Sequence, residues 1–224
     1  MEKLKVTLDW EGSLKPGEFP AGPEVAEEMG LESPGVYLCI QRYPNVTVLY
    51  AGKSMCLRKR IHEHLASTLG FQYWRRKDNP VPRSSFQTDL DNANRKAADA
   101  LYLENEYAFI RPDKFGLGQF NDLKNNIGEA IREVERTEFY YCSIEKGISI
   151  NTESGARPDV ITTNALIAEL EAALIGHTLL FAAQHNHVVC DNSRRETATG
   201  SVITDSQAFA SWLNEKFSQK GPIR

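Results

Sequence analysis

The chain has 224 residues, of which 41% are hydrophobic and 25% are charged. This is an ordinary composition for a globular protein of one domain, and the length allows a substantial buried core. The chain has no run of about 18 apolar residues and no signal-peptide core at its start, so we expect a cytoplasmic protein without a membrane span. The net charge of −4 argues against a protein that coats nucleic acid generally.

Charge is distributed unevenly along the chain. Residues 1–34 carry three basic and eight acidic side chains, a net charge of −5, whereas residues 53–96 carry ten basic and four acidic ones, a net charge of +6. Such asymmetry is typical either of a surface that faces phosphate or of a solvated face. The sequence leaves both interpretations open.

The first elements are short. Residues 1–34 form an acidic extension broken by four prolines, with a short strand expected over residues 3–10 and one helical turn near residues 24–29. Two apolar, β-branched runs follow at 36–41 and 46–51, separated by the turn sequence RYPN. This pattern predicts a β-hairpin.

A helix is expected over residues 55–67, with Ser54 as its cap. Leu57, Ile61 and Leu65 recur every fourth residue and define a buried stripe. Arg60 and His64 are also four residues apart, so they share one edge of the helix next to the core. The helix can therefore hold two polar groups at the rim of a cleft.

The remainder is more irregular. Residues 66–136 look like an insertion, mostly loop at first, with helices expected over 92–110 and 121–134. A strand is expected over 138–144, a polar loop after it, an apolar helix capped by Thr163 or Asn164, a short strand near 187–190 and a closing helix over 206–217. The four cysteines form no CxxC pair and are expected to be thiols rather than a zinc site or disulfides.

Six polar positions now form an ordered string along the expected elements. Gly35-Val36-Tyr37 and Tyr50-Ala51-Gly52 are two tripeptides on the hairpin, and Lys53 follows directly. Arg60 and His64 come on the next helix, and Glu171 opens the pattern Glu-x-x-Leu-Ile on the apolar helix. In residue types, order and spacing the string resembles the GIY-YIG nuclease family, over roughly residues 35–67 and 137–192.

The resemblance implies an α+β fold with a small, mostly antiparallel, three-stranded central sheet flanked by helices. It implies one domain over residues 1–224, with an N-terminal extension (1–34), a large helical and loop insertion (66–136) and a C-terminal extension (193–224). It also implies a metal-dependent DNA endonuclease. The asparagine usual in the family is not cleanly placed here, and Asn186 is the nearest candidate, with Asn192 second.

For the site, the resemblance implies catalytic roles for Tyr37, Tyr50, Lys53, Arg60, His64 and Glu171. Glu171 would hold Mg²⁺ (or Mn²⁺), and the guanidinium of Arg60 would bind the phosphate. A tyrosine base needs its pKa lowered from about 10, and Lys53 together with the metal would have to lower it. An imidazole could share that role, so the general base remains open among Tyr50, Tyr37 and His64.

The residue pattern itself favours a special role for Glu171. Its helix is nearly all apolar, and an ionised carboxylate buried there is costly without a partner or a metal. Glu169 is the rival carboxylate, and we expect it on the solvent side because it lies about 200° round the helix.

Binding to DNA is expected from a second set of residues, which are Arg58, Lys59, Trp74, Arg75, Arg76 and Lys77. The aromatic and basic stretch from residue 73 to 77 reads equally well as a surface loop. Only about thirty residues follow Asn192, so we expect a compact, restriction-like enzyme with recognition in its insertion. Cleavage of both strands favours a homodimer on a palindromic target.

Two other functions stay open. The first is a catalytically weak or inactive nucleic-acid-binding module that keeps the nuclease fold. The second is a protein of unrelated fold in which the motifs coincide by chance. The sequence does not reveal the target, whether RNA is accepted, or the biological pathway.

Overall fold

The computed structural model describes residues 4–20, 22–44, 46–69, 74–76, 107–109, 120–152, 162–192 and 202–218. Its largest sheet has five strands in the order β2-β7-β3-β4-β9. These strands are β2 (Glu11–Leu14), β7 (Thr137–Ser143), β3 (Gly35–Arg42), β4 (Thr47–Ser54) and β9 (Val188–Cys190). Four of them are antiparallel neighbours, and β9 joins β4 in parallel.

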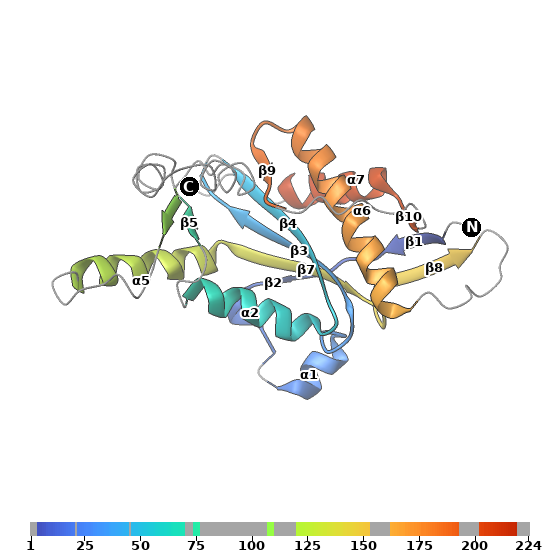
Figure 1. Cartoon of the computed structure of the whole chain (residues 1–224), viewed down its shortest axis with the longest axis horizontal. Helices are drawn as coiled ribbons and strands as arrows, with labels where there is room; N and C mark the ends of the chain where they lie inside the picture. The colour runs from blue at the N-terminus through green and yellow to red at the C-terminus, as the bar shows by residue number, and fades with distance from the viewer. Residues whose placement is uncertain are drawn as a thin grey trace, which may run out of the picture.

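Two helices cover opposite faces of this sheet, α2 (Leu57–Leu69) and α6 (Thr163–Gln184) (Figure 1). Side chains alternate along β3, and the two hydrophobic clusters follow that alternation. Val36 and Leu38 belong to the cluster that contains the apolar side of α6. Tyr37 and Cys39 belong to the cluster that contains Leu57 and Ile61 of α2. Because both faces are covered, the first six residues of β3 are all buried.

A second, three-stranded sheet has the order β10-β1-β8. It consists of β10 (Val202–Thr204), β1 (Leu4–Leu8) and β8 (Ile148–Thr152), and α7 (Ser206–Ser218) follows β10. Leu4 and Val6 of β1 share a core with α6 and with Phe209 and Leu213 of α7. Strand β1 and helix α7, which lie near opposite ends of the chain, are therefore both packed on the α6 side of the molecule.

The described part of the insertion holds strands as well as a helix. Trp74–Arg76 (β5) and Tyr107–Phe109 (β6) pair antiparallel, and α5 (Phe120–Glu135) leads into β7. The helix expected over 121–134 is confirmed. Of the helix expected over 92–110, residues 107–109 form a strand, so the prediction is wrong there, and the other residues lie outside the described part of the chain. Residues 74–76, expected as loop, also form a strand. The short elements η1 (Pro16–Glu18) and α1 (Pro23–Glu28) lie in the N-terminal extension.

The α+β class is confirmed, and the expected three-stranded antiparallel unit is present as β7-β3-β4. The expected sheet was too small, because β2 and β9 extend it to five strands and a separate sheet forms beside it. Helix α6 begins one residue earlier than expected, since Thr162 is its cap and accepts a hydrogen bond from the backbone N–H of Ala165 (3.4 Å).

Helix α6 is 22 residues long with a mean hydropathy of 1.6, so by length and composition alone it could cross a membrane. Its packing gives another reason for this apolar character. Eight of its residues are buried, against β4, β9, β10 and α7. A helix that lies between two sheets and a second helix needs apolar side chains around much of its circumference.

Candidate active site

The two tyrosines of the tripeptides lie on the same face of the hairpin. In the β3–β4 register Tyr37 is opposite Gly52 and Tyr50 is opposite Cys39, so the two phenols are diagonal neighbours. Their ring centroids are 6.2 Å apart. Gly52 makes this arrangement possible, because a Cβ there would lie 2.4 Å from the hydroxyl end of the Tyr37 ring.

Helix α2 brings Arg60 and His64 to the same phenol. The hydroxyl of Tyr37 lies 2.7 Å from Nε2 of His64, and Nε of Arg60 donates to that hydroxyl at 3.3 Å. The ring centroids of Tyr50 and His64 are 5.5 Å apart. A guanidinium only donates, so the phenol accepts from Arg60 and donates its own proton to Nε2. This assignment places the imidazole proton of His64 on Nδ1.

Burial controls the charge of this group, which we call the tyrosine cluster (Tyr37, Tyr50, Arg60 and His64). Burial and the neighbouring Tyr50 raise the pKa of Tyr37 well above its ordinary value, and Arg60 offsets this only in part. Burial, with a smaller effect of Arg60, lowers the pKa of His64 to about 4. At neutral pH, Tyr37 and His64 are therefore both uncharged, and Arg60 carries a positive charge.

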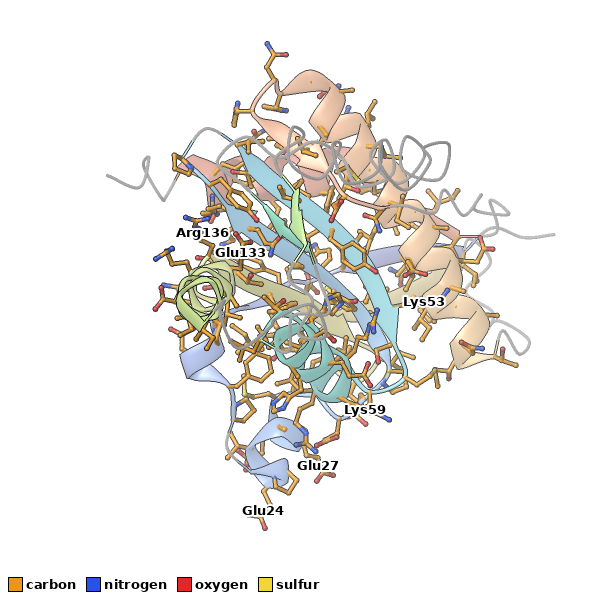
Figure 2. The ribbon with its side chains drawn as sticks, turned by 60° about the vertical axis from the view of Figure 1, so that its left-hand side comes forward. Glu24, Glu27, Lys53, Lys59, Glu133 and Arg136 are labelled. Carbon is orange, nitrogen blue, oxygen red and sulfur yellow. The ribbon has the colours of Figure 1, made fainter. Side chains whose placement is uncertain are left out.

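Lys53 and Glu171 form the second polar group. Nζ of Lys53 lies 2.8 Å from Oε2 of Glu171, with the lysine side chain 29% exposed and the glutamate side chain 14% exposed. Figure 2 shows Lys53 beside α6, the helix that carries Glu171. A carboxylate that is largely buried needs such a partner, because an unpaired charge would be costly there.

The two polar groups leave the sheet on opposite sides. Lys53 is paired with Val36, which belongs to the α6 side, whereas Tyr37 and Tyr50 pack on the α2 side. Residues 50 and 53 are an odd number of positions apart on one strand, so their side chains alternate to opposite faces. The six residues that the sequence placed in one site thus form two groups near the end of β4. Lys53 and Glu171 lie on the α6 side of the strand, and the tyrosine cluster lies on its α2 side.

Of the two candidate asparagines, Asn192 lies at β4 and Asn186 does not. The carboxamide of Asn192 accepts from the backbone N–H of Ala51 (3.0 Å) and donates to its carbonyl (2.6 Å). Asn192 is buried, whereas Asn186 is exposed in the turn after α6. Strand β9 pairs with β4 only as far as Leu49. Beyond that point, the side chain of Asn192 makes the hydrogen bonds that a further strand residue would make, and it holds the backbone between Tyr50 and Gly52.

The residues expected to bind DNA have different surroundings. Nε of Arg58 lies 2.5 Å from Oε1 of Glu32, so this cation is paired within the protein. Lys59 is exposed on α2 (Figure 2). Trp74, Arg75 and Arg76 form β5, of which the backbone alone is described, and Lys77 lies outside the described residues.

Two acidic residues near the site were missed by the sequence reasoning. Glu63 lies 3.3 Å from an Nη atom of Arg60, and its spacing of three residues on one helix was a signal for this contact. Glu32 comes from the loop before β3, and nothing local indicated its pairing with Arg58. Glu169, expected on the solvent side, is half-buried.

The number of ligating side chains near Glu171 limits the kind of metal site that the protein can form. Among the described residues, no group of three or more His, Cys, Asp and Glu side chains could hold an ion. Glu171 alone offers one carboxylate, already facing a cation at 2.8 Å. One carboxylate suits Mg²⁺, which keeps several waters and takes its remaining ligands from phosphate. Glu171 therefore fits a metal held jointly with a substrate.

Comparison of the chain with protein-family models gives no match. Comparisons with curated proteins and with solved structures also give none. The resemblance to GIY-YIG nucleases consequently rests on the motif string and on the arrangement of its residues. It enters the functional assignment as a proposal.

Proposed function

We propose that the protein is a metal-dependent DNA endonuclease that hydrolyses phosphodiester bonds. One observation carries the proposal, which is the hydrogen-bonded chain from Arg60 through Tyr37 to His64 at the sheet surface. It joins a cation, a phenol and an uncharged imidazole, of which Tyr37 is fully buried while the Arg60 side chain remains 35% exposed. Buried polar groups are costly to assemble, and this set matches what a phosphodiester needs.

Arg60 is the phosphate-binding group in this proposal. Its contacts with Tyr37 and Glu63 use two of its five N–H donors. The remaining donors form a planar fork suited to two phosphate oxygens. Tyr37 and Glu63 orient the guanidinium from two sides, so that little side-chain entropy is lost when a phosphate binds.

A divalent metal at Glu171 would supply charge neutralisation on the phosphoryl oxygens and a bound water of lowered pKa. Around the tyrosine cluster, on the other face of β4, the protein's own groups differ in their suitability to accept a proton from the attacking water. Tyr37 is fully buried, is already engaged by Arg60 and His64, and has a raised pKa. His64 has its pKa lowered to about 4 and resists protonation beside Arg60. This leaves half-buried Tyr50 as the proposed base, with Tyr37 and His64 as positioning residues.

Plasmid cleavage with Mg²⁺ and with EDTA tests the proposal. Arg60→Ala and Glu171→Gln should each lower cleavage at least a hundredfold, in line with the loss of a transition-state contact. Glu169→Gln is the matched control two residues away on the same helix and should cleave like the wild type. Cleavage that survives both Arg60→Ala and Glu171→Gln would refute the site assignment.

A second function is favoured by one feature of the geometry. Because Lys53 and Glu171 lie on the face of β4 opposite to the tyrosine cluster, a protein that binds nucleic acid without efficient cleavage also fits. Binding of a DNA duplex measured by fluorescence anisotropy, with no strand breaks after prolonged incubation in Mg²⁺ or Mn²⁺, would establish this alternative.

Restriction-like specificity and a dimer belong to the same proposal. A single site cuts one strand per event, so double-strand cleavage at a palindrome calls for two copies related by a two-fold axis. Sequencing the ends produced from a defined DNA pool identifies the target. Light scattering of the protein with and without a cleavable duplex tests the dimer, and a monomer in both states would remove it.

A further inference from the structure

The ion pair between Lys53 and Glu171 places a cation on the carboxylate that the proposed function gives to the metal, and the inference here rests on that function. The ammonium is 2.8 Å from Oε2 of Glu171. Mg²⁺ binds carboxylate oxygen at about 2.0–2.1 Å and demands nearly ideal octahedral geometry. An ammonium and a dication on one oxygen would lie less than about 5 Å apart and repel each other.

We propose that Lys53 is an internal counterion that occupies the metal-binding oxygen of Glu171 in the metal-free protein and is displaced when a divalent metal binds. In the metal-free state, the ammonium neutralises a largely buried carboxylate that would be costly to leave unpaired. Metal binding therefore competes with an intramolecular cation. The affinity of the free protein for metal is lowered as a result.

The nature and position of Lys53 suit it for displacement. Lysine is a compact charge on a flexible four-carbon stem, so it can leave one oxygen and stay near the site. It stands one residue before the end of β4, and its side chain is 29% exposed. The charge balance also changes: the metal-free pair is neutral, whereas a dication on Glu171 with a released ammonium gives a net charge of +2. That positive charge attracts phosphate.

The displacement couples metal to DNA. While Lys53 is paired with Glu171, its positive charge is neutralised within the protein. The ammonium becomes available to phosphate only after a metal binds. Metal should therefore strengthen DNA binding, and DNA should strengthen metal binding by the same factor. Lys53 produces this coupling because it is the counterion of Glu171 in the metal-free state and contacts phosphate in the metal-bound state.

Binding of Mn²⁺ to the full-length, DNA-free protein, followed by electron paramagnetic resonance, tests the inference. Lys53→Met removes the charge and keeps an unbranched side chain, so it should bind Mn²⁺ at least tenfold more tightly than the wild type. Lys5→Met, at an exposed position of β1, is the control and should match the wild type. Glu171→Gln should lose the site. Unchanged or weaker Mn²⁺ binding by folded Lys53→Met overturns the inference, as does retained binding by Glu171→Gln.

A second measurement uses the wild-type protein and does not depend on whether Lys53→Met folds. The side-chain signal of Lys53 in a ¹³C-lysine-labelled sample, assigned with Lys53→Arg, should shift on titration with Mg²⁺. A signal that stays fixed at saturating Mg²⁺ overturns the inference. Fluorescence anisotropy of a labelled DNA duplex, measured with Ca²⁺ in place of Mg²⁺, gives the affinity for DNA. This affinity should rise with Ca²⁺ concentration in the wild type and rise much less in Lys53→Met.

Failure of this inference and failure of the proposed function can be told apart. If the wild type cuts no DNA but Lys53→Met still tightens Mn²⁺ binding, the counterion role stands and the nuclease assignment falls. If the wild type cuts DNA and Lys53→Met binds Mn²⁺ no more tightly, the counterion role falls and the nuclease assignment stands.

Discussion

Asn192 binds both backbone polar groups of Ala51, accepting from its N–H and donating to its carbonyl. The side chain thereby replaces the next residue of strand β9 along the edge of β4. Because Ala51 stands between Tyr50 and Gly52, these two hydrogen bonds fix the part of the strand from which the phenol and the glycine face Tyr37.

Replacing Asn192 by Ala should lower the free energy of unfolding by about 2–4 kcal/mol, because it leaves a buried donor and a buried acceptor without partners. Asn192→Asp should be about as damaging, since a carboxylate can accept from Ala51 but cannot donate to its carbonyl. Urea unfolding of each variant measures the change. Asn186→Ala, in the exposed turn, is the control and should stay within about 0.5 kcal/mol of the wild type; equal losses at 186 and 192 would contradict this role.

The choice between these two asparagines could not be made from the sequence. It depends on the parallel pairing of β9 with β4, which aligns Cys190 with Leu49 and so brings residue 192 to residue 51. Nothing local to either asparagine encodes that register. By contrast, the β3–β4 hairpin and the α2 stripe were predictable, because their apolar periodicity is a property of short, continuous segments.

Strands β8 and β10 were missed for a related reason. The sequences Ile148–Thr152 and Val202–Thr204 are short, and polar runs flank both of them in the chain. Both form by pairing with β1 at the far N-terminal end. Such strands are stabilised by long-range partners and core packing, and local propensity is a weak guide to them.

The separation of Lys53 from the tyrosines depends on where this strand ends. The strand was expected over residues 46–51, whereas β4 continues to Ser54 and so includes Lys53. Tyr50 and Lys53 then lie three positions apart on one strand, and their side chains alternate to opposite faces. The pairing of Lys53 with Glu171 follows once α6 covers that side. The sequence alone did not indicate on which side of the sheet α6 packs.

Gly52 should be intolerant of any side chain. In Gly52→Ala the new Cβ would meet the ring end of Tyr37 at 2.4 Å, and Tyr37 is fully buried and cannot swing away. We expect a loss of roughly 1–3 kcal/mol in unfolding free energy together with loss of the site geometry. Gly176→Ala is the matched control, because it is exposed on α6 with open space around it, and it should stabilise the protein by up to about 1 kcal/mol. Thermal unfolding compares the two, and a neutral Gly52→Ala would show that the ring of Tyr37 can move.

The hydroxyl of Tyr37 should contribute to stability as well as to the site. Tyr37→Phe removes the acceptor of Arg60 and the partner of Nε2 of His64, leaving a largely buried imidazole nitrogen unsatisfied. The expected cost is about 1–3 kcal/mol by urea unfolding. Tyr50→Phe, at a half-buried ring, should cost less stability while removing the proposed base. If Tyr50→Phe were the more destabilising change, the division of roles between the two phenols would be wrong.

His64 should make the stability of the protein depend on pH in a definite direction. Its pKa is lowered to about 4 in the folded protein, whereas an unfolded histidine titrates near 6.5. Between these values the unfolded chain binds more protons than the folded one, so stability is fully present above about pH 6.5 and falls as the pH drops toward 4. From pH 7 to pH 5 the loss attributable to His64 is about 2 kcal/mol.

His64→Gln keeps an acceptor within reach of Tyr37 but cannot titrate. Between pH 7 and pH 5, its free energy of unfolding should therefore fall by about 2 kcal/mol less than that of the wild type. Other groups contribute equally to both proteins. Urea unfolding at the two pH values gives the difference directly. Identical pH dependence in the two proteins would mean that His64 titrates normally in the folded state. The phenol proton would then not be committed to its Nε2, and His64 would return as a candidate base beside Tyr50.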